Sequence, residues 1–181
     1  MDFLHTVLLG IIEGITEFLP ISSTGHLLIA EHWLGRRSDL FIIAIQAGAI
    51  LAVVFIYWRR LWDLTAHMRR PENWDYLIKL ATSFVLTVLG GLIAKKMGLE
   101  LPDTIAPIAW ALIVGGMVIF AVEWYASRQA PSDRLTWSVA FWVAVGQIIA
   151  AVFPGTSRSA ATIIGGMSQK LSRTAAAEFS F

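Results

Sequence analysis

The sequence predicts an all-α polytopic membrane protein that forms a single membrane domain over residues 1–181. Hydrophobic residues make up 56% of the chain and charged residues 15%, whereas charged residues make up about 25% of a soluble domain. Three apolar runs in the middle of the chain approach the roughly 20 residues that cross a bilayer. Each flank is also apolar but contains a proline near its middle, Pro20 or Pro154.

The first flank, residues 3–34, predicts a helix, a break and a second helix. Proline lacks a backbone donor and disfavours helical geometry in the residue before it. The hydroxyl residues after Pro20 suit the N-cap of a new helix. Each half is about 12 to 18 residues long, which is short for a complete span. We therefore expect a re-entrant hairpin, whose non-helical turn is tolerated at membrane depth only inside protein or beside a wet cavity.

Three membrane spans are predicted between the flanks, over residues 41–58, 76–94 and 105–124. The first ends in aromatic side chains followed by Arg59 and Arg60, as is typical of a membrane interface. The third contains a pair of glycines, which allows another helix to pack closely.

The second flank, residues 137–168, resembles the first, because hydroxyl residues follow Pro154 as they follow Pro20. This similarity indicates an internal repeat. Three intervening spans place the two hairpins on opposite sides of the membrane, so the repeats are inverted and their breaks are expected to meet near the midplane. Residues 1–130 would form the first repeat and residues 131–181 the start of the second, lacking roughly 80 to 90 residues of it.

The distribution of basic residues favours one orientation. The segment 59–74 is expected to be a loop, and if it is cytoplasmic, eight Lys and Arg residues lie on that side and four lie outside. The first hairpin would then enter from outside and the second from the cytoplasm.

Glu13 and Glu17 are four positions apart and share one face of the first helix. Ionisable groups inside an apolar helix are costly in lipid and are therefore expected at a wet or paired site. Two carboxylates suit a divalent cation that keeps several water ligands. Glu17 could instead act as a base. The alternative is a helix at the membrane surface, with both side chains in the interface.

The first break is followed by a cluster of polar residues: Ser22, Ser23, Thr24 and His26. Hydroxyls and free backbone N–H groups at a helix N-terminus bind anions, and phosphate is their usual guest. His26 lies three residues after Ser23 and could exchange a proton with it or with a leaving group. The alternatives are a serine that only caps the helix and a histidine that only packs.

The second break repeats the hydroxyl pattern with Thr156, Ser157 and Ser159 and adds Arg158. The planar guanidinium suits phosphate oxygens. Thr162 lies one helical turn beyond Arg158 and can face the same cavity. The alternative is that Arg158 only pairs with a carboxylate of the first hairpin.

Together the two breaks predict a phosphoryl-transfer site. The carboxylates of Glu13 and Glu17 would hold a metal ion, and the metal and Arg158 would bind phosphate oxygens. A hydroxyl would then attack phosphorus. Positioning and charge neutralisation are most of what such chemistry requires. Nothing in the sequence suggests nucleic-acid binding.

The two motifs EGITEFLPISSTGH and PGTSRSAATIIGGM resemble those of the bacterial undecaprenyl pyrophosphate phosphatases, the bacitracin-resistance family. The flanking segments IQAGAILAVVFIYWRR and SRTAAAEFSF resemble the same family, so the similarity extends along nearly the whole chain.

This resemblance implies a multi-pass enzyme of the bacterial plasma (inner) membrane that recycles the lipid carrier for cell-wall synthesis. It would use a divalent cation, Mg²⁺ or Ca²⁺, in a site open to the outer face. It would hydrolyse undecaprenyl pyrophosphate, a polyprenyl pyrophosphate lipid, to undecaprenyl phosphate and inorganic phosphate. A homodimer is left open. The motif positions that match are Glu13, Glu17, Ser23, His26, Ser157, Arg158 and Thr162.

The attacking group is open at this point. Ser23 is favoured as the nucleophile, with Glu17 or His26 as its base and Arg158 stabilising the phosphoryl group. A nucleophilic His26 or a metal-activated water are the alternatives.

A different family of lipid phosphatases and a lipid transporter are the two other function classes that the motifs suggest. The lipid phosphatases related to acid phosphatase use a nucleophilic histidine after a Ser-Arg pair, and no histidine follows Arg158 in this chain. Inverted repeats with broken helices are also typical of transporters. A polyprenyl-phosphate flippase that uses the same anion site is therefore the second hypothesis, although clustered carboxylates beside a phosphate site favour chemistry.

Overall fold

The computed structural model of the chain describes residues 2–99 and 105–181. Apart from one isolated bridge between Ser132 and Leu171, the regular structure in this part of the chain is helical. The helices, in order, are α1 (Asp2–Phe18), α2 (Ser23–Leu34), α3 (Asp39–Ile56), α4 (Trp58–Ala66), α5 (Pro71–Lys96), α6 (Ile105–Ala126), α7 (Trp137–Val152), α8 (Arg158–Ser168) and α9 (Arg173–Ser180).

Both predicted breaks are confirmed at the positions expected from the prolines. Residues 19–22 separate α1 from α2, and residues 153–157 separate α7 from α8. Each new helix begins with a serine cap, as the hydroxyls after proline predict. Ser22 accepts a hydrogen bond from the backbone N–H of Gly25, and Ser157 accepts one from that of Ala160.

The segment 59–74, expected to be a loop, is mostly helical, so that expectation is wrong. The chain bends by 69° between α3 and α4 at Tyr57. Trp58, Leu61 and Trp62 recur at the spacing of one helix face, which explains why this basic segment forms an amphipathic helix. Proline is favoured at the first helical position, and α5 accordingly begins at Pro71 rather than at the predicted residue 76.

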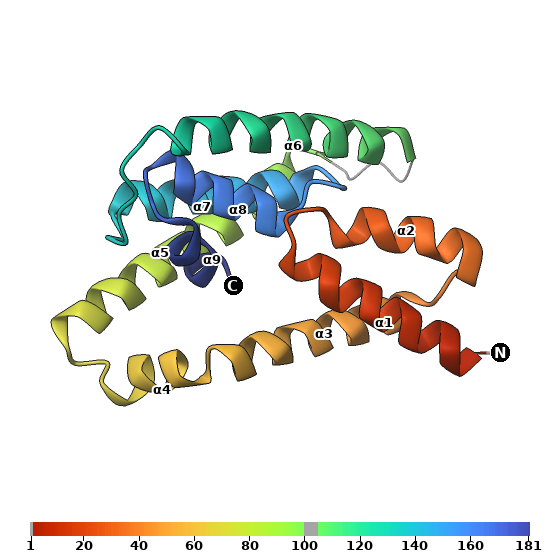
Figure 1. The fold of residues 1–181 in the computed structure, drawn as a ribbon, viewed down its shortest axis with the longest axis horizontal. Coiled ribbons are helices and arrows are strands. Elements are labelled where there is room, and N and C mark those ends of the chain that lie inside the picture. The colour runs from red at the N-terminus through yellow and green to blue at the C-terminus, as the bar shows by residue number, and fades with distance from the viewer. Residues whose placement is uncertain (1, 100–104) are drawn as a thin grey trace.

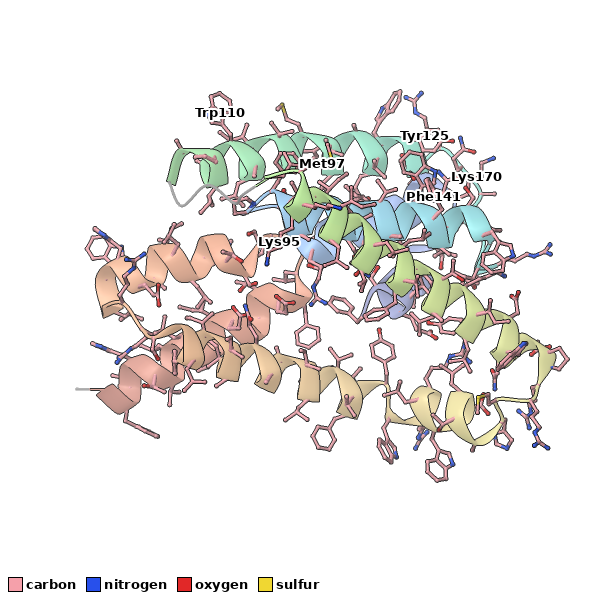
Figure 2. The ribbon with its side chains drawn as sticks, turned by 180° about the vertical axis from the view of Figure 1, so that it is seen from behind. Lys95, Met97, Trp110, Tyr125, Phe141 and Lys170 are labelled. Carbon is pink, nitrogen blue, oxygen red and sulfur yellow. The ribbon has the colours of Figure 1, made fainter. Side chains whose placement is uncertain are left out.

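Helices long and apolar enough to cross a membrane are present, as predicted. By length and composition α5 and residues 106–126 of α6 qualify, and α3 taken together with α4 is a third candidate. Aromatic and aliphatic side chains project from the outer surfaces of the helices, among them Trp110 of α6, which is 65% exposed (Figure 2). An apolar surface of this kind is suited to lipid.

Helices α7 and α8 pack closely because small residues line their contact. A Cβ added to Gly146 of α7 would collide with the backbone carbonyl of Ala161. A Cβ added to Gly165 of α8 would lie 2.8 Å from the carbonyl oxygen of Trp142. Small residues let transmembrane helices approach in this way. A core of buried apolar residues joins the pair to α9; it contains Val139, Ala140, Val143, Met167, Leu171, Ala176 and Phe179.

Helix α6 packs against both breaks. A Cβ on Gly25, at the start of α2, would lie 3.2 Å from Leu112, and one on Gly155 would lie 2.9 Å from the Cα of Ile108. Gly155 also has a φ of +86°, which favours glycine. Figure 1 shows the consequence: the turn between α1 and α2 faces the turn between α7 and α8 near the middle of the molecule, with α6 running past both.

Candidate active site

Glu17 joins the two breaks. One of its carboxylate oxygens, Oε1, pairs with the guanidinium of Arg158. The other, Oε2, accepts a hydrogen bond of 2.8 Å from the hydroxyl of Ser23. The last turn of α1 therefore connects the first residue of α2 to the first residue of α8. Arg158 therefore pairs with a carboxylate of the first hairpin, as the alternative hypothesis expects. It is compatible with a phosphate site, because the guanidinium is still half exposed.

A second contact between the breaks lies beside this pair. Ser159 is buried, and its hydroxyl donates to the backbone carbonyl of Leu19 at 3.1 Å. It also lies 3.1 Å from the hydroxyl of Ser157. Leu19 is two residues beyond Glu17, and Ser159 directly follows Arg158. The hydroxyl that the sequence suggested for phosphate binding thus holds the two breaks in register.

The backbone of Ser22 is strained and sets the orientation of His26. Ser22 has a φ of +67°, a region that non-glycine residues avoid. Its carbonyl lies 2.8 Å from Nδ1 of His26. A carbonyl oxygen can only accept, so Nδ1 must donate, and in the neutral ring Nε2 then has no proton. Among the hydrogen bonds of the described residues, none joins His26 to Ser23, so Glu17 is the group that contacts this serine.

Glu13 is fully buried one turn before Glu17. Neither of its carboxylate oxygens has a hydrogen-bond partner among the described residues. It lies close enough to Glu17 and Arg158 to interact with both electrostatically. A buried carboxylate without a partner is unfavourable, so this position needs a cation or a proton.

The residues fit a divalent cation of the kind that keeps water ligands. Within the described ranges, no group of three or more His, Cys, Asp or Glu side chains forms a complete cage. Mg²⁺ is usually bound by one or two carboxylates, with waters and substrate phosphate oxygens completing its shell. Glu13 and Glu17 provide that number of carboxylates.

The remaining predicted residues differ in their surroundings. Thr24 is exposed in the first turn of α2, and Thr156 is half-buried in the second break. Thr162 is fully buried, and its hydroxyl donates to the carbonyls of Arg158 and Ser159 within its own helix, at 2.8 and 3.2 Å. Its hydroxyl therefore anchors the first turn of α8.

Sequence reasoning missed the apolar residues that position these groups. Leu19 contributes only its carbonyl, and Ile108 and Leu112 contribute the surface on which the breaks rest. The signal in the sequence was Gly25 and Gly155, since a glycine at each break indicates a close approach by another segment.

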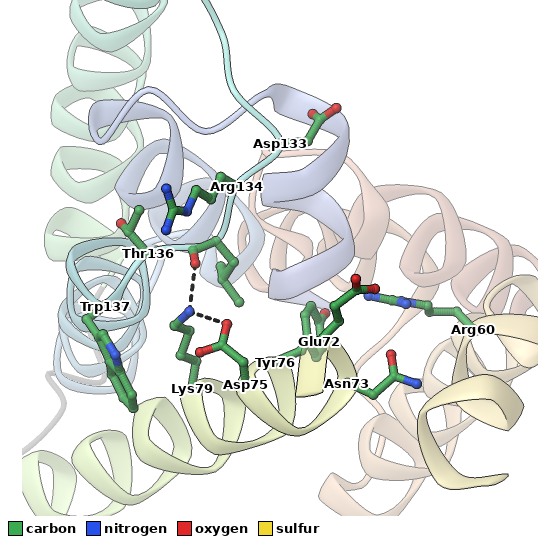
Figure 3. Close-up of a pocket in the computed structure, with 11 residues that line it drawn as sticks. Arg60, Glu72, Asn73, Asp75, Tyr76, Lys79, Asp133, Arg134, Thr136 and Trp137 are labelled. Carbon is green, nitrogen blue, oxygen red and sulfur yellow. Dashed lines mark hydrogen bonds and ion pairs between the residues drawn. The ribbon is translucent and has the colours of Figure 1, made fainter. Parts of the chain in front are cut away.

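A polar cavity of about 680 Å³ lies away from the two breaks, between α5 and the start of α7 (Figure 3). Lys79 is buried at its wall, where it pairs with Asp75 and donates to the carbonyl of Leu135 at 2.9 Å. None of the predicted site residues lines this cavity. The pair with Asp75 lies within α5, and the bond to Leu135 connects α5 to the segment that leads into α7.

Comparison with known proteins shows one family. The family described as bacitracin resistance protein BacA matches residues 6–181. An undecaprenyl-diphosphatase of Rhizobium etli (strain CIAT 652) is 60% identical over 182 residues, which cover 100% of this chain and 69% of the relative. Undecaprenyl-diphosphatases of Xylella fastidiosa (strain 9a5c) and Xanthomonas euvesicatoria pv. vesicatoria (strain 85-10) are 57% and 52% identical. Each match covers 99% of this chain, and 69% and 68% of the respective relative.

Proposed function

The chain belongs to the bacitracin resistance protein BacA family, and from this premise we propose that its two breaks form the active site of an undecaprenyl-diphosphatase. The enzyme hydrolyses undecaprenyl pyrophosphate to undecaprenyl phosphate and inorganic phosphate. One observation supports this site above the others: Glu17 contacts both a hydroxyl nucleophile, Ser23, and a phosphate-binding cation, Arg158.

Ser23 is the attacking group in this proposal. Its hydroxyl proton already points to Glu17, so the carboxylate is placed to accept it as Ser23 Oγ attacks the terminal phosphorus. The bond from Oγ to phosphorus forms, the bond from phosphorus to the bridging oxygen breaks, and undecaprenyl phosphate leaves. Water then attacks the phosphoserine: the bond from the water oxygen to phosphorus forms, the bond from phosphorus to Oγ breaks, Glu17 returns its proton to Oγ, and inorganic phosphate is released.

Arg158 neutralises charge on the phosphoryl oxygens during both steps. In the substrate-free protein its guanidinium pairs with Glu17. A pyrophosphate offers the guanidinium a second anion with matching bidentate geometry. Arginine placed in this way contributes about 10³-fold or more to phosphoryl transfer.

Glu13 and Glu17 would hold the divalent cation. When bound, the ion supplies charge neutralisation at the pyrophosphate oxygens. Among the described carboxylates, the buried one of Glu13 has no hydrogen-bond partner, so such an ion would compensate its charge. In the neutral ring of His26 the hydrogen bond at Nδ1 leaves the lone pair of Nε2 available to act as a second base or ligand.

In the membrane, we propose that the two hairpins are re-entrant and related as inverted repeats, with the site open to the outer face. The similar break-and-cap patterns support this arrangement. The chain has no cysteine, so single cysteines can report the topology. A cysteine replacing the exposed Arg69 should be labelled only from the cytoplasm, and one replacing Arg36 only from outside. The reverse pattern would contradict the proposed orientation.

Phosphate release from undecaprenyl pyrophosphate by the purified full-length protein in detergent tests the function. We expect release that depends on Mg²⁺. A folded protein that binds the lipid but releases no phosphate would contradict the enzyme assignment and favour lipid transport.

A further inference from the structure

A long apolar groove extends from the two breaks along α6. Its volume is about 1000 Å³, and α6, α7 and α8 form its walls. Among the residues that the structure describes, none of those that line it is charged. Typical wall residues are Val145 and Ile149 of α7 and Ile164 of α8. This interior is suited to a hydrocarbon ligand rather than to a polar one.

One end of the groove coincides with the candidate active site. Pro20 of the first break and Thr156 and Ser157 of the second break line it there. Ser157 directly precedes Arg158, whose guanidinium pairs with Glu17. The other hydroxyl in the lining, that of Ser168 toward the opposite end of α8, already donates to the carbonyl of Gly165 at 2.7 Å. The groove is therefore polar where it meets the breaks and apolar beyond them.

We propose that this groove binds the polyprenyl chain of the substrate, with the pyrophosphate held at the breaks. This inference rests on the proposed function, because it assigns to the lipid a place continuous with the phosphate site. The continuity at Pro20, Thr156 and Ser157 is the reason to choose the chain of the substrate over the acyl chain of a bulk lipid, which has no headgroup bound at that end.

Gly115 and Gly116 of α6 keep the groove open. Both line it, and a Cβ built on either meets no atom within 4 Å in the described part of the chain beyond its own helix. A side chain added there would enter the groove without displacing protein. Gly115 lies seven residues beyond Ile108, which contacts the second break, so it is about 10 Å farther along the helix.

The test is Gly115→Leu, assayed with two substrates. The added side chain should displace methylene groups of a long chain, and each displaced methylene lowers affinity about fourfold. We expect the KM for undecaprenyl pyrophosphate to rise about tenfold or more. The rise should be much smaller for geranyl pyrophosphate, whose two prenyl units end near this position.

Gly48→Leu is the matched control. Gly48 also lies in an apolar helix, α3, and a Cβ there likewise meets no atom within 4 Å among the described residues outside its own helix. It does not line the groove. The same substitution should leave the ratio of the two KM values unchanged.

Binding of undecaprenyl phosphate, measured by isothermal titration calorimetry in detergent, separates this inference from the proposed function because it requires no turnover. We expect Gly115→Leu to bind it about tenfold more weakly than the wild type. Equal affinity of the variant and the wild type, or an equal rise in KM for the long and short substrates, would overturn the assignment. Either result would indicate that bulk lipid occupies the groove. Loss of phosphate release in the wild type, with the affinity difference retained, would overturn only the proposed chemistry.

Discussion

Glu17 and Arg158 lie 141 positions apart in the chain and form an ion pair between the two helix breaks. The second oxygen of the same carboxylate accepts the hydroxyl proton of Ser23. One side chain thus contacts both the hydroxyl of Ser23 and the guanidinium of Arg158. We attribute the phosphatase activity to this arrangement.

Glu17→Gln tests the proposed base. The amide keeps the size of the side chain but cannot accept the proton of Ser23 as a base, and it leaves Arg158 without its anion. We expect kcat to fall by about 10² to 10⁴. Phosphate release at saturating substrate is the measurement. Glu31→Gln is the control, because Glu31 lies at the end of α2 and accepts a hydrogen bond from the backbone of Arg37. A wild-type kcat in Glu17→Gln would show that Glu17 is not the base.

Glu13→Gln tests the cation site. A ligand at 100 times its dissociation constant stabilises a protein by about 2.7 kcal/mol. Mg²⁺ should therefore raise the melting temperature of the wild type, and it should raise that of Glu13→Gln much less. The Mg²⁺ concentration for half-maximal activity should also rise about tenfold, as expected for loss of one charged ligand. Equal thermal shifts in both proteins would show that Glu13 does not bind the ion.

Ser159→Ala tests the register of the breaks. It removes the hydrogen bond to the carbonyl of Leu19, which still accepts one from the backbone N–H of Ile21 at 2.8 Å. The unfolding free energy should therefore fall by about 0.5 to 1.5 kcal/mol, the net contribution of one hydrogen bond. Because the bond positions the site and does not touch substrate, kcat should fall while KM changes little. Ser127→Ala is the control, since Ser127 is exposed and bonds only within its own turn. A large rise in KM with unchanged kcat would favour direct phosphate binding by Ser159.

Gly155→Ala tests the contact of the second break with α6. The new Cβ would lie 2.9 Å from the Cα of Ile108, and the φ of +86° disfavours any side chain. We expect a loss of about 2 kcal/mol or more of stability, seen as a lower melting temperature in detergent. Gly48→Ala, in open space on a helix, should instead be stabilising by about 0.5 to 1 kcal/mol. Equal melting temperatures for the two variants would contradict the packing described here.

The sequence was informative where local chemistry decides structure. The prolines at 20 and 154 predicted both breaks, because proline acts on its own turn of chain. The hydroxyls after them predicted the caps, and the polar residues in apolar helices indicated that Glu17, Ser23 and Arg158 would meet, as they do. These are short-range effects that need no knowledge of the tertiary fold.

The rest depends on contacts between distant segments. Nothing local shows that Ser159 would bond to Leu19 rather than to phosphate. The helix α4 was missed because it is only 9 residues long, too short to show a clear helical periodicity, and because its charged residues are typical of a loop. The groove along α6 depends on how three helices pack, which single-segment patterns do not specify.

A double-mutant cycle on phosphate release tests the central claim most directly, that Ser23 and Arg158 act as one site. Ser23→Ala and Arg158→Ala should each lower kcat by about 10³. Because groups that act as a unit are not additive, the double variant should be no more than about tenfold worse than either single variant. Losses that multiply, or near-wild-type activity in either single variant, would contradict a site shared by the two breaks.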